Sequence, residues 1–225
     1  VAATNTDGTT FGDDVTFTTP AATAPPAAKN AVTIAAAPTT VTFGVATTIS
    51  GQVSGPNNGG AQVTLEENPY PFTAGFKATT VTTTTNATGG YTLNLVPIAN
   101  ARYRVSVKTS PPVTSPEVLV NVKVKVSLRL SDSTPSKGQR VNFTGTVLPG
   151  HDGKVVQIQR RTSTGGWRTV ARATLVATTP VNGVARSKFA KRIRVTRKGT
   201  YRARFAPADG DHVTGYSARR TARVH

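Results

Sequence analysis

The sequence contains an internal repeat, and this repeat constrains the fold more than any other feature. Residues 47–68 (TTISGQVSGPNNGGAQVTLEEN) align with residues 140–161 (RVNFTGTVLPGHDGKVVQIQRR) at an offset of 93 to 94 positions, and Tyr103 aligns with Tyr201 at an offset of 98. Short stretches of alternating apolar and polar residues fill both copies. A repeat of about 95 residues is long enough for one small β domain with its own core, so we expect two such domains in tandem.

The composition favours strands throughout the chain. Thr and Val are abundant and suit pleated strands, while 20 Gly and 15 Pro residues supply turns. No window has a convincing helical period, so the sequence predicts an all-β fold. The alternation predicts these inward-facing residues: Ile49, Val53, Val63, Leu65, Leu93, Leu95, Tyr103 and Val105 in the first copy, and Phe143, Val147, Val156, Ile158, Trp167, Ile193, Val195, Tyr201, Ala203 and Phe205 in the second.

The boundary between the copies has an unusual pattern. Every second residue from Val118 to Leu130 is Val or Leu, and no Gly or Pro interrupts the run. In an extended conformation, at about 3.3 Å per residue, this segment spans roughly 40 Å. The pattern predicts that the last strand of the first domain passes almost directly into the first strand of the second. We therefore expect a stiff, end-to-end pair of domains, 29–124 and 125–225.

The second copy carries strand motifs in a fixed order: GTVLPG, GKVVQIQ, GGWRTV, GTYRARF and a closing TARV. In this order the motifs resemble the bacterial Ig-like repeats of secreted and cell-surface proteins. The first copy fits more loosely, because YPFTAGFKATTV stands in place of the Trp strand. The resemblance covers about residues 29–225. It implies two tandem Ig-like β-sandwiches and an extracellular location, and it implies little about function.

Residues 1–28 form a separate region with a strand-like part and a Pro/Ala-rich linker (PAATAPPAA, 20–28). The stretch VAATNTDGTTFGDDVTFTT is similar to the last hairpin of a bacterial fibronectin type III domain. A lone hairpin is marginal in water, so this segment needs a partner. Either the rest of its domain precedes Val1, or it is a disordered tail, or it donates Phe11, Val15 and Phe17 to an open sheet edge of another copy.

Charge is very unevenly distributed. Residues 125–225 carry 21 basic and 4 acidic side chains, whereas residues 29–124 carry 6 basic and 3 acidic ones. Residues 1–28 contain three Asp and no basic side chain. The strand pattern of the second domain predicts a basic outer sheet face formed by Arg160, Arg161, Arg168, Arg192, Arg194, Arg202 and Arg204.

A basic face of this kind allows three interpretations. It attracts polyanions such as an acidic cell-wall polymer or glycan, and this binding would weaken with salt. It could instead be a solvated surface, or it could complement the acidic N-terminal segment of a neighbouring copy. Sequence-specific nucleic acid binding is not expected, because aromatic residues for base stacking make up only 6% of the chain.

The sequence offers little for catalysis or cofactors. There is no Cys, which excludes disulfides and thiolate chemistry, and no apolar run is long enough for a membrane-spanning helix. His151 and His212 lie beside Asp152 and Asp211 in expected turns, without a Ser or Glu constellation. Asp209 and Asp211 alone fall short of the six to eight oxygens that Ca²⁺ prefers, so we expect a polar turn there. We expect neither an enzyme nor a metal or other cofactor.

The leading functional hypothesis is therefore structural. The chain would be a subunit or segment of a cell-surface fibre, filament or stalk, assembled through β-strand contacts between copies. One alternative is an adhesive module whose basic C-terminal domain binds an acidic glycan or wall polymer. Another is a spacer region of a larger secreted enzyme.

Overall fold

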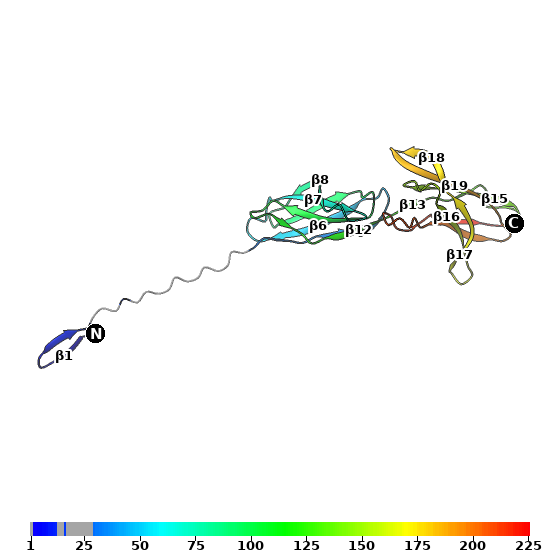
Figure 1. The fold of residues 1–225 in the computed structure, drawn as a ribbon. Helices are drawn as coiled ribbons and strands as arrows, with labels where there is room; N and C mark the ends of the chain where they lie inside the picture. Colours follow the sequence, from blue (N-terminus) through cyan, green and yellow to red (C-terminus); the bar gives the residue numbers. More distant parts are fainter. Residues whose placement is uncertain (1, 13–15, 17–28) are drawn as a thin grey trace.

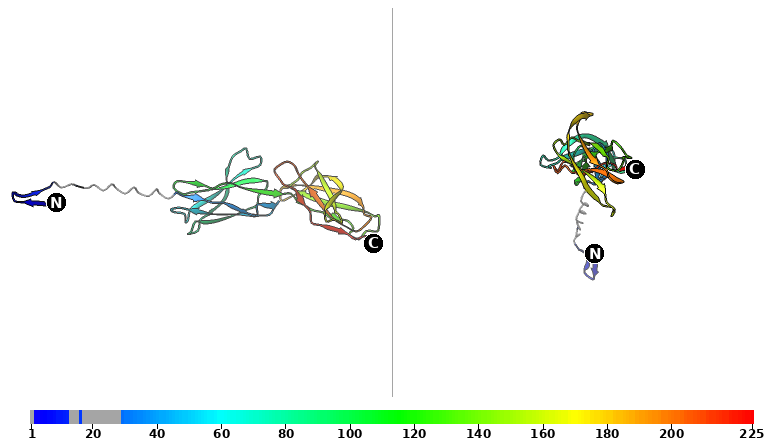
Figure 2. Two further views of the ribbon diagram at one scale, coloured as in Figure 1. Left: turned by 90° about the horizontal axis from the view of Figure 1, so that it is seen from below. Right: turned by 90° about the vertical axis from the view of Figure 1, so that its right-hand side faces the viewer.

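The computed structural model describes residues 2–12, 16 and 29–225 of the chain. All regular elements in this described part are β-strands, as the sequence predicted. The described residues include no helix with the length and apolar character that a membrane crossing requires. Buried apolar side chains form two separate clusters, one in the N-terminal lobe (residues 29–123) and one in the C-terminal lobe (residues 124–225). The lobes lie end to end (Figure 1 and Figure 2).

Two sheets supply the core of the N-terminal lobe. In the first sheet, β6 (Thr47–Ser54) pairs with β3 (Ala31–Val32), β4 (Ala35–Ala37) and β9 (Gly90–Leu95). The second sheet has the order β5 (Thr40–Thr42), β12 (Val118–Lys123), β10 (Ala101–Val107), β7 (Gln62–Pro69) and β8 (Lys77–Thr84), and β11 (Val113–Thr114) also pairs with β10. All these pairs are antiparallel except β5 with β12, which run parallel.

The C-terminal lobe repeats this arrangement. Its first sheet has the order β13 (Lys125–Val126), β15 (Arg140–Leu148), β19 (Val184–Arg194) and β18 (Val176–Val181), with β14 (Arg129–Leu130) also on β15. Its second sheet has the order β17 (Trp167–Thr174), β16 (Val155–Arg161), β20 (Gly199–Phe205) and β21 (Gly215–Tyr216), with β22 (Arg220–Ala222) also on β20. The aligned segments of the sequence repeat thus form equivalent strands, β6 with β15 and β7 with β16.

The Gly that the two copies share has a packing role. Gly51 lies in β6 and Gly145 in β15, where the neighbouring strand crosses very closely. A Cβ at Gly51 would collide with the carbonyl oxygen of Thr33, and a Cβ at Gly145 would collide with that of Ser127. Only a residue without a side chain permits this approach of two backbones. The repeated Gly therefore fixes how the first strand of each lobe enters its sheet.

The predicted inward residues lie in or against the two apolar clusters, with one exception. Trp167 is half-buried outside the core, so its prediction was wrong. The cause is a β-bulge: Ile158 pairs with Ala171, but the next residue, Gln159, pairs with Thr169, so that one residue of β17 is skipped. Because side chains alternate along a strand, this extra residue moves Trp167 to the outer face.

The chain crosses between the lobes in an extended conformation. Strand β12 ends at Lys123 and β13 begins at Lys125, so that only Val124 separates them. Val120, Val122, Val124 and Val126 are all buried. The alternating Val and Leu residues therefore contribute to both cores without an intervening loop, in agreement with the pattern in the sequence.

The N-terminal segment folds into a hairpin in its described part. Strand β1 (Ala2–Asn5) pairs antiparallel with β2 (Gly8–Phe11), and these two strands form a sheet of their own. Phe11 pairs with Ala2 and is 78% exposed. Val15 and Phe17, the other two residues of the expected donor strand, lie outside the described residues.

Two buried tyrosines predict how the stability of the N-terminal lobe depends on pH. Tyr91 donates a hydrogen bond to the carbonyl oxygen of Thr33 (2.6 Å), and burial raises the pKa of Tyr91 from 10.0 to about 12. Burial, followed by a hydrogen bond to Glu67, also raises the pKa of Tyr103. A raised folded-state pKa means that the contribution to stability is complete below the unfolded pKa and is lost as pH rises through the folded one.

We therefore expect the free energy of unfolding to fall between pH 10 and pH 12, and to fall less steeply in Tyr91→Phe. Urea denaturation at a series of pH values measures both slopes. Equal slopes in the two proteins would show that the Tyr91 phenol ionises equally in the folded and unfolded states.

Candidate functional site

The contact between the two lobes is built around one loop. Residues 206–214 connect β20 to β21 and extend from the C-terminal lobe to the end of the N-terminal lobe. The backbone N–H of Val213 donates to the carbonyl oxygen of Val122 (2.9 Å), and the N–H of Val124 donates to that of Val213 (3.2 Å). The crossing chain is thus paired with a second segment at the point where it leaves the N-terminal lobe.

Asn100 holds this loop from the N-terminal side. Its backbone N–H donates to the carbonyl oxygen of Asp211 (2.7 Å), and its side-chain amide donates to that of Gly210 (2.8 Å). Its side-chain oxygen accepts a hydrogen bond from the N–H of Val122 (2.7 Å). Asn100 is only 5% exposed, so each of these groups would otherwise be a buried polar group without a partner.

Gly210 allows the loop to pack closely against the N-terminal lobe. Its φ of 85° lies in the left-handed region that favours glycine. A Cβ at this position would also collide with the ring of Tyr70 from the N-terminal lobe. The close approach therefore requires glycine both for its backbone conformation and for its lack of a side chain.

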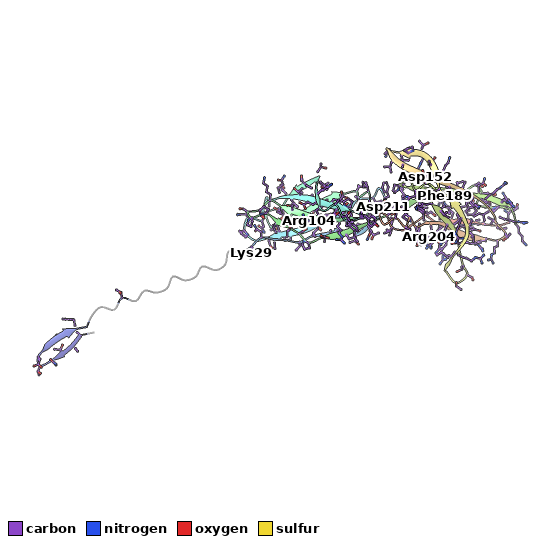
Figure 3. All side chains as sticks on the ribbon, in the orientation of Figure 1. Lys29, Arg104, Asp152, Phe189, Arg204 and Asp211 are labelled. Atoms are coloured by element: carbon purple, nitrogen blue, oxygen red, sulfur yellow. The ribbon has the colours of Figure 1, made fainter. Side chains whose placement is uncertain are left out.

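Four ligand-type side chains meet beside this loop. Asp209, Asp211 and His212 come from the loop itself, and His151 comes from the turn between β15 and β16. One ligand atom of each residue lies within 4.8 Å of the other three. His151 Nε2 lies 3.1 Å from Asp209 Oδ2, and His212 Nδ1 lies 2.9 Å from Asp211 Oδ1. We call these four residues the His–Asp cluster; Asp211 marks its position between the lobes in Figure 3.

The turn that carries His151 is fixed by its neighbours. The backbone N–H of His151 donates to the Ser187 hydroxyl (2.7 Å), which in turn donates to the Asp152 carboxylate (2.6 Å). The imidazole packs against the ring of Phe205, with 5.1 Å between the ring centroids. The His151 ring is therefore positioned by the core of the C-terminal lobe and by β19.

Backbone carbonyl groups set the orientation of both imidazoles. His151 Nδ1 lies 2.8 Å from the carbonyl oxygen of Pro149, and His212 Nε2 lies 2.9 Å from that of Ile98. Since a carbonyl oxygen only accepts, each of these nitrogens carries the proton. In the neutral imidazoles the lone pairs are then on His151 Nε2 and His212 Nδ1, the two nitrogens that face the carboxylates.

The two carboxyl groups of the cluster differ in acidity. Burial, and then the neighbouring Asp211 carboxyl, raise the pKa of Asp209 above its ordinary value. Burial alone would also raise the pKa of Asp211, but the contacts with Asp209 and His212 outweigh it, so the pKa of Asp211 falls below its ordinary value. Asp211 is thus the carboxylate that holds negative charge most firmly.

A solvent-connected cavity of about 500 Å³ borders the cluster. Phe43, Ile98 and Ala99 line it from the N-terminal lobe, and the four cluster residues line it together with residues of the C-terminal lobe. A small solute can therefore reach the side chains of Asp209 and Asp211, whereas the His212 and His151 side chains are only 4% and 8% exposed.

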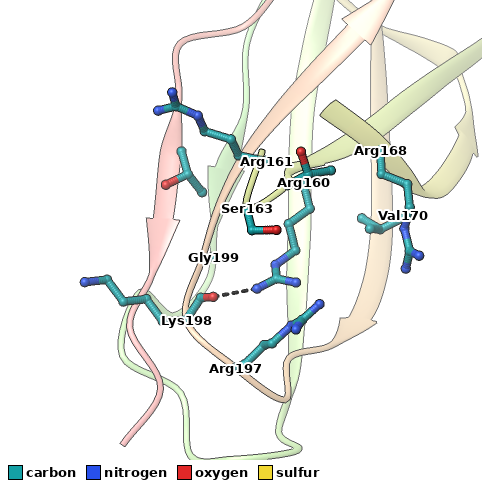
Figure 4. Close-up of a pocket in the computed structure, with 10 residues that line it drawn as sticks. Arg160, Arg161, Ser163, Arg168, Val170, Arg197, Lys198 and Gly199 are labelled. Carbon is teal, nitrogen blue, oxygen red and sulfur yellow. Dashed lines mark hydrogen bonds between the residues drawn. The ribbon is translucent and has the colours of Figure 1, made fainter. Parts of the chain in front are cut away.

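A second candidate site lies at the end of the C-terminal lobe that faces away from the joint. There β16 ends, β17 begins and β20 begins, and a cavity of about 540 Å³ opens between them (Figure 4). Its charged lining residues are all basic: Arg160, Arg161, Arg168, Arg197 and Lys198. Arg160 donates to the carbonyl oxygen of Lys198 (2.6 Å), while its Nε is buried without a hydrogen-bond partner among the described residues. We call these five residues the cationic end.

The seven arginines of the expected basic face are distributed over three places. Arg160, Arg161 and Arg168 belong to the cationic end. Arg202 and Arg204 lie on β20, whereas Arg192 and Arg194 lie on β19, which belongs to the other sheet. The seven residues therefore do not share one sheet face, because alternation along a strand predicts inside or outside but does not predict the sheet.

On the outer face of β20, Arg202 lies between two aromatic rings. Its guanidinium carbon is 4.1 Å from the centroid of Trp167 and 4.2 Å from that of Tyr216. Its Nε also donates to the Gln159 side chain (2.9 Å). Arg202 is therefore engaged within the protein, by cation–π stacking and hydrogen bonding, and contributes less to a free anion-binding surface than its charge suggests.

No family model matches the chain, and no curated protein matches it significantly.

We expect Asn100→Ala to loosen the joint. Truncation leaves the N–H of Val122 and the carbonyl oxygen of Gly210 without their partners, at a cost of about 1–3 kcal/mol for a buried group. Because the chain contains no Cys, spin labels at Ser54→Cys and Ser163→Cys report the distance between the lobes without background labelling. The distance distribution should be narrow in the otherwise wild-type chain and broad in Asn100→Ala.

Asn94→Ala is the matched control, because Asn94 is exposed on β9 and its side chain bonds only to the Thr48 hydroxyl in the described part. It should leave the distance distribution unchanged. Equal breadth in wild type and Asn100→Ala would contradict the assigned role of Asn100.

Proposed function

We propose that this chain is a non-catalytic structural protein of the cell exterior, in which two tandem Ig-like β-sandwiches form a stiff spacer within a surface stalk or fibre. The observation that carries this proposal is the joint: the crossing chain contains no Gly, no Pro and no loop, and a loop of the C-terminal lobe is hydrogen-bonded to Asn100 of the N-terminal lobe. A joint of this kind fixes the orientation of one lobe relative to the other.

The strand connections support the Ig-like part of the proposal. In each lobe a central strand (β6 or β15) pairs with the opening segment and with a later strand (β9 or β19). In the other sheet, β7 lies between its hairpin partner β8 and the later strand β10. In the C-terminal lobe, β16 lies between β17 and β20 in the same way. This exchange of strands between two sheets is characteristic of Ig-like sandwiches of about 100 residues.

The assembly part of the proposal concerns residues 1–28. Hairpin β1–β2 pairs within itself, so Phe11 already has a main-chain partner. The other edge of β2 has no partner among the described residues, so a donor strand would use that edge at Phe11 and continue through Val15 and Phe17. The acidic side chains of this segment and the strongly basic C-terminal lobe give neighbouring copies complementary charge.

The test combines shape and association. We expect small-angle X-ray scattering to give the profile of a rod for a variant lacking residues 1–20. The full chain should give the profile of the same rod with the N-terminal segment added. We also expect sedimentation to show association that depends on concentration in the full chain and is lost in the truncated variant. A bent or flexible pair of lobes would contradict the spacer, whereas a full chain that stays monomeric at high concentration would contradict only the assembly.

A second candidate function is anion binding by the cationic end. Five basic side chains line one cavity, no acidic residue is among its lining, and the cavity lies at the exposed end of the C-terminal lobe. Such a site is suited to phosphate or carboxylate groups of an acidic wall polymer or glycan.

We expect heparin to bind the full chain and to bind more weakly as salt increases. Arg168→Gln with Arg197→Gln should lower the affinity about tenfold, which corresponds to about 1.4 kcal/mol. Arg192→Gln with Arg194→Gln is the matched control, because it removes the same charge from the other sheet. Equal losses in the two double variants would indicate attraction by net charge alone and would exclude a site at the cationic end.

A further inference from the structure

We propose that the His–Asp cluster binds one divalent transition-metal ion, with Zn²⁺ as the ion that fits best, and that this ion stiffens the joint between the lobes. His151, Asp209, Asp211 and His212 would be its four ligands. The proposal goes beyond the spacer function, because it concerns a binding site whose occupancy can be measured independently of the shape of the chain.

The donor set selects the class of ion. Two imidazole nitrogens and two carboxylate oxygens are suitable for Zn²⁺ and related transition metals, whereas Ca²⁺ and Mg²⁺ prefer oxygen ligands only. Zinc bonds of about 2.0–2.2 Å in a tetrahedral site place neighbouring ligand atoms about 3.3 Å apart. The corresponding atoms here are 2.9 and 3.1 Å apart within the two His–Asp pairs, and none of the four is more than 4.8 Å from another.

The hydrogen bonds around the cluster are those expected of metal-binding histidines. Such residues usually donate the second ring N–H to a carbonyl or carboxylate group, which fixes the tautomer and aims the other nitrogen at the metal. His151 and His212 both do so, through the carbonyl oxygens of Pro149 and Ile98. Their remaining nitrogens face the cluster from two different segments of the chain.

Two atoms of the cluster are buried without a hydrogen bond of acceptable geometry among the described residues. They are His212 Nδ1 and Asp211 Oδ1. The His212 side chain is 4% exposed, so a lone pair on its Nδ1 has no access to bulk water. An uncompensated buried lone pair is costly, and it is more costly when it faces the oxygen of a carboxylate. A cation bound between the two atoms would remove both penalties.

The placement of charge also singles out this cluster. The C-terminal lobe has 4 acidic side chains among 21 basic ones, yet Asp209 and Asp211 lie in one loop and point to one place. No Lys or Arg side chain forms a salt bridge with them in the described part; the nitrogens that face their carboxylates belong to His151 and His212. Two carboxylates balance the charge of one divalent ion, which leaves the occupied site neutral.

The position of the site links metal binding to the joint. All four ligands belong to the C-terminal lobe, but the loop that supplies three of them is also the loop that Asn100 holds through Gly210 and Asp211. The carbonyl oxygen of Ile98, in the N-terminal lobe, orients His212. An ion that fixes the loop therefore also fixes the surface against which the N-terminal lobe packs. With four protein ligands and no open position, the site would be structural and not catalytic.

The experiment uses the full chain and Zn²⁺ itself, with Co²⁺ as a spectroscopic probe. After chelator treatment, we expect titration calorimetry to show one Zn²⁺ per chain, and Co²⁺ to give the intense visible absorption of a tetrahedral site that Zn²⁺ then abolishes. Zn²⁺ should raise the Tm, because an ion that binds the folded state stabilises it. It should also narrow the spin-label distance distribution of Ser54→Cys with Ser163→Cys.

Asp209→Asn is the first variant, because Asp209 lies at the exposed side of the cluster and its replacement preserves size. His151→Gln is the second. Each should lower the affinity for Zn²⁺ at least tenfold and remove the rise in Tm. Asp132→Asn and His225→Gln are the matched controls, since both residues lie outside the cluster, Asp132 half-buried and His225 exposed. Both controls should bind Zn²⁺ as the wild type does.

Three results would overturn the proposal: no binding of Zn²⁺ or Co²⁺ at micromolar concentration, binding that the two cluster variants leave unchanged, or a loss of binding in the His225→Gln control. A chain that binds Zn²⁺ but whose lobes move freely would retain the site, overturn the stiffening of the joint by the ion and contradict the spacer. A rigid chain that does not bind Zn²⁺ would contradict the proposed metal site and leave the proposed spacer function supported.

Discussion

The contact between the two lobes depends on one requirement: the polar groups of loop 206–214 that meet the N-terminal lobe must find partners there. Loop 206–214 leaves its own lobe and brings the carbonyl groups of Gly210 and Asp211 against the N-terminal lobe. Asn100 pairs with both and also with the N–H of Val122, so three buried groups depend on one side chain and its backbone. Because unpaired buried groups are costly, these hydrogen bonds favour the observed arrangement of the lobes, and the His–Asp cluster lies in the same loop.

The distribution of charge divides the C-terminal lobe between its two ends. Acidic side chains are scarce in this lobe, and Asp152, Asp209 and Asp211 all lie at the end that meets the N-terminal lobe. At the opposite end Arg160, Arg168 and their neighbours line a cavity whose charged residues are all basic. Three of the lobe's four acidic side chains thus lie at the joint, whereas Asp132 lies beside Gln139 near the start of β15, at the other end.

The sequence predicted the all-β fold, most of the core and the extended crossing, because alternation and repetition are local patterns. It failed at Trp167, where a bulge in β17 reverses the alternation without a signal in composition. It also failed to assemble the His–Asp cluster, because His151 lies 58 residues before Asp209 and only the pairing of sheets brings the two together. The seven arginines show the same limit, since period-two patterns do not tell which sheet a strand joins.

The parallel pairing of β5 with β12 has a mechanical consequence. Thr40–Thr42 lie near the start of the N-terminal lobe, and their partners Asn121–Lys123 lead directly into the next lobe. Tension applied along the chain pulls these two neighbours in opposite directions along their own axes. The hydrogen bonds between them are then loaded together in shear and are not peeled apart one after another. A chain that bears load outside a cell would resist extension at this short pair of strands.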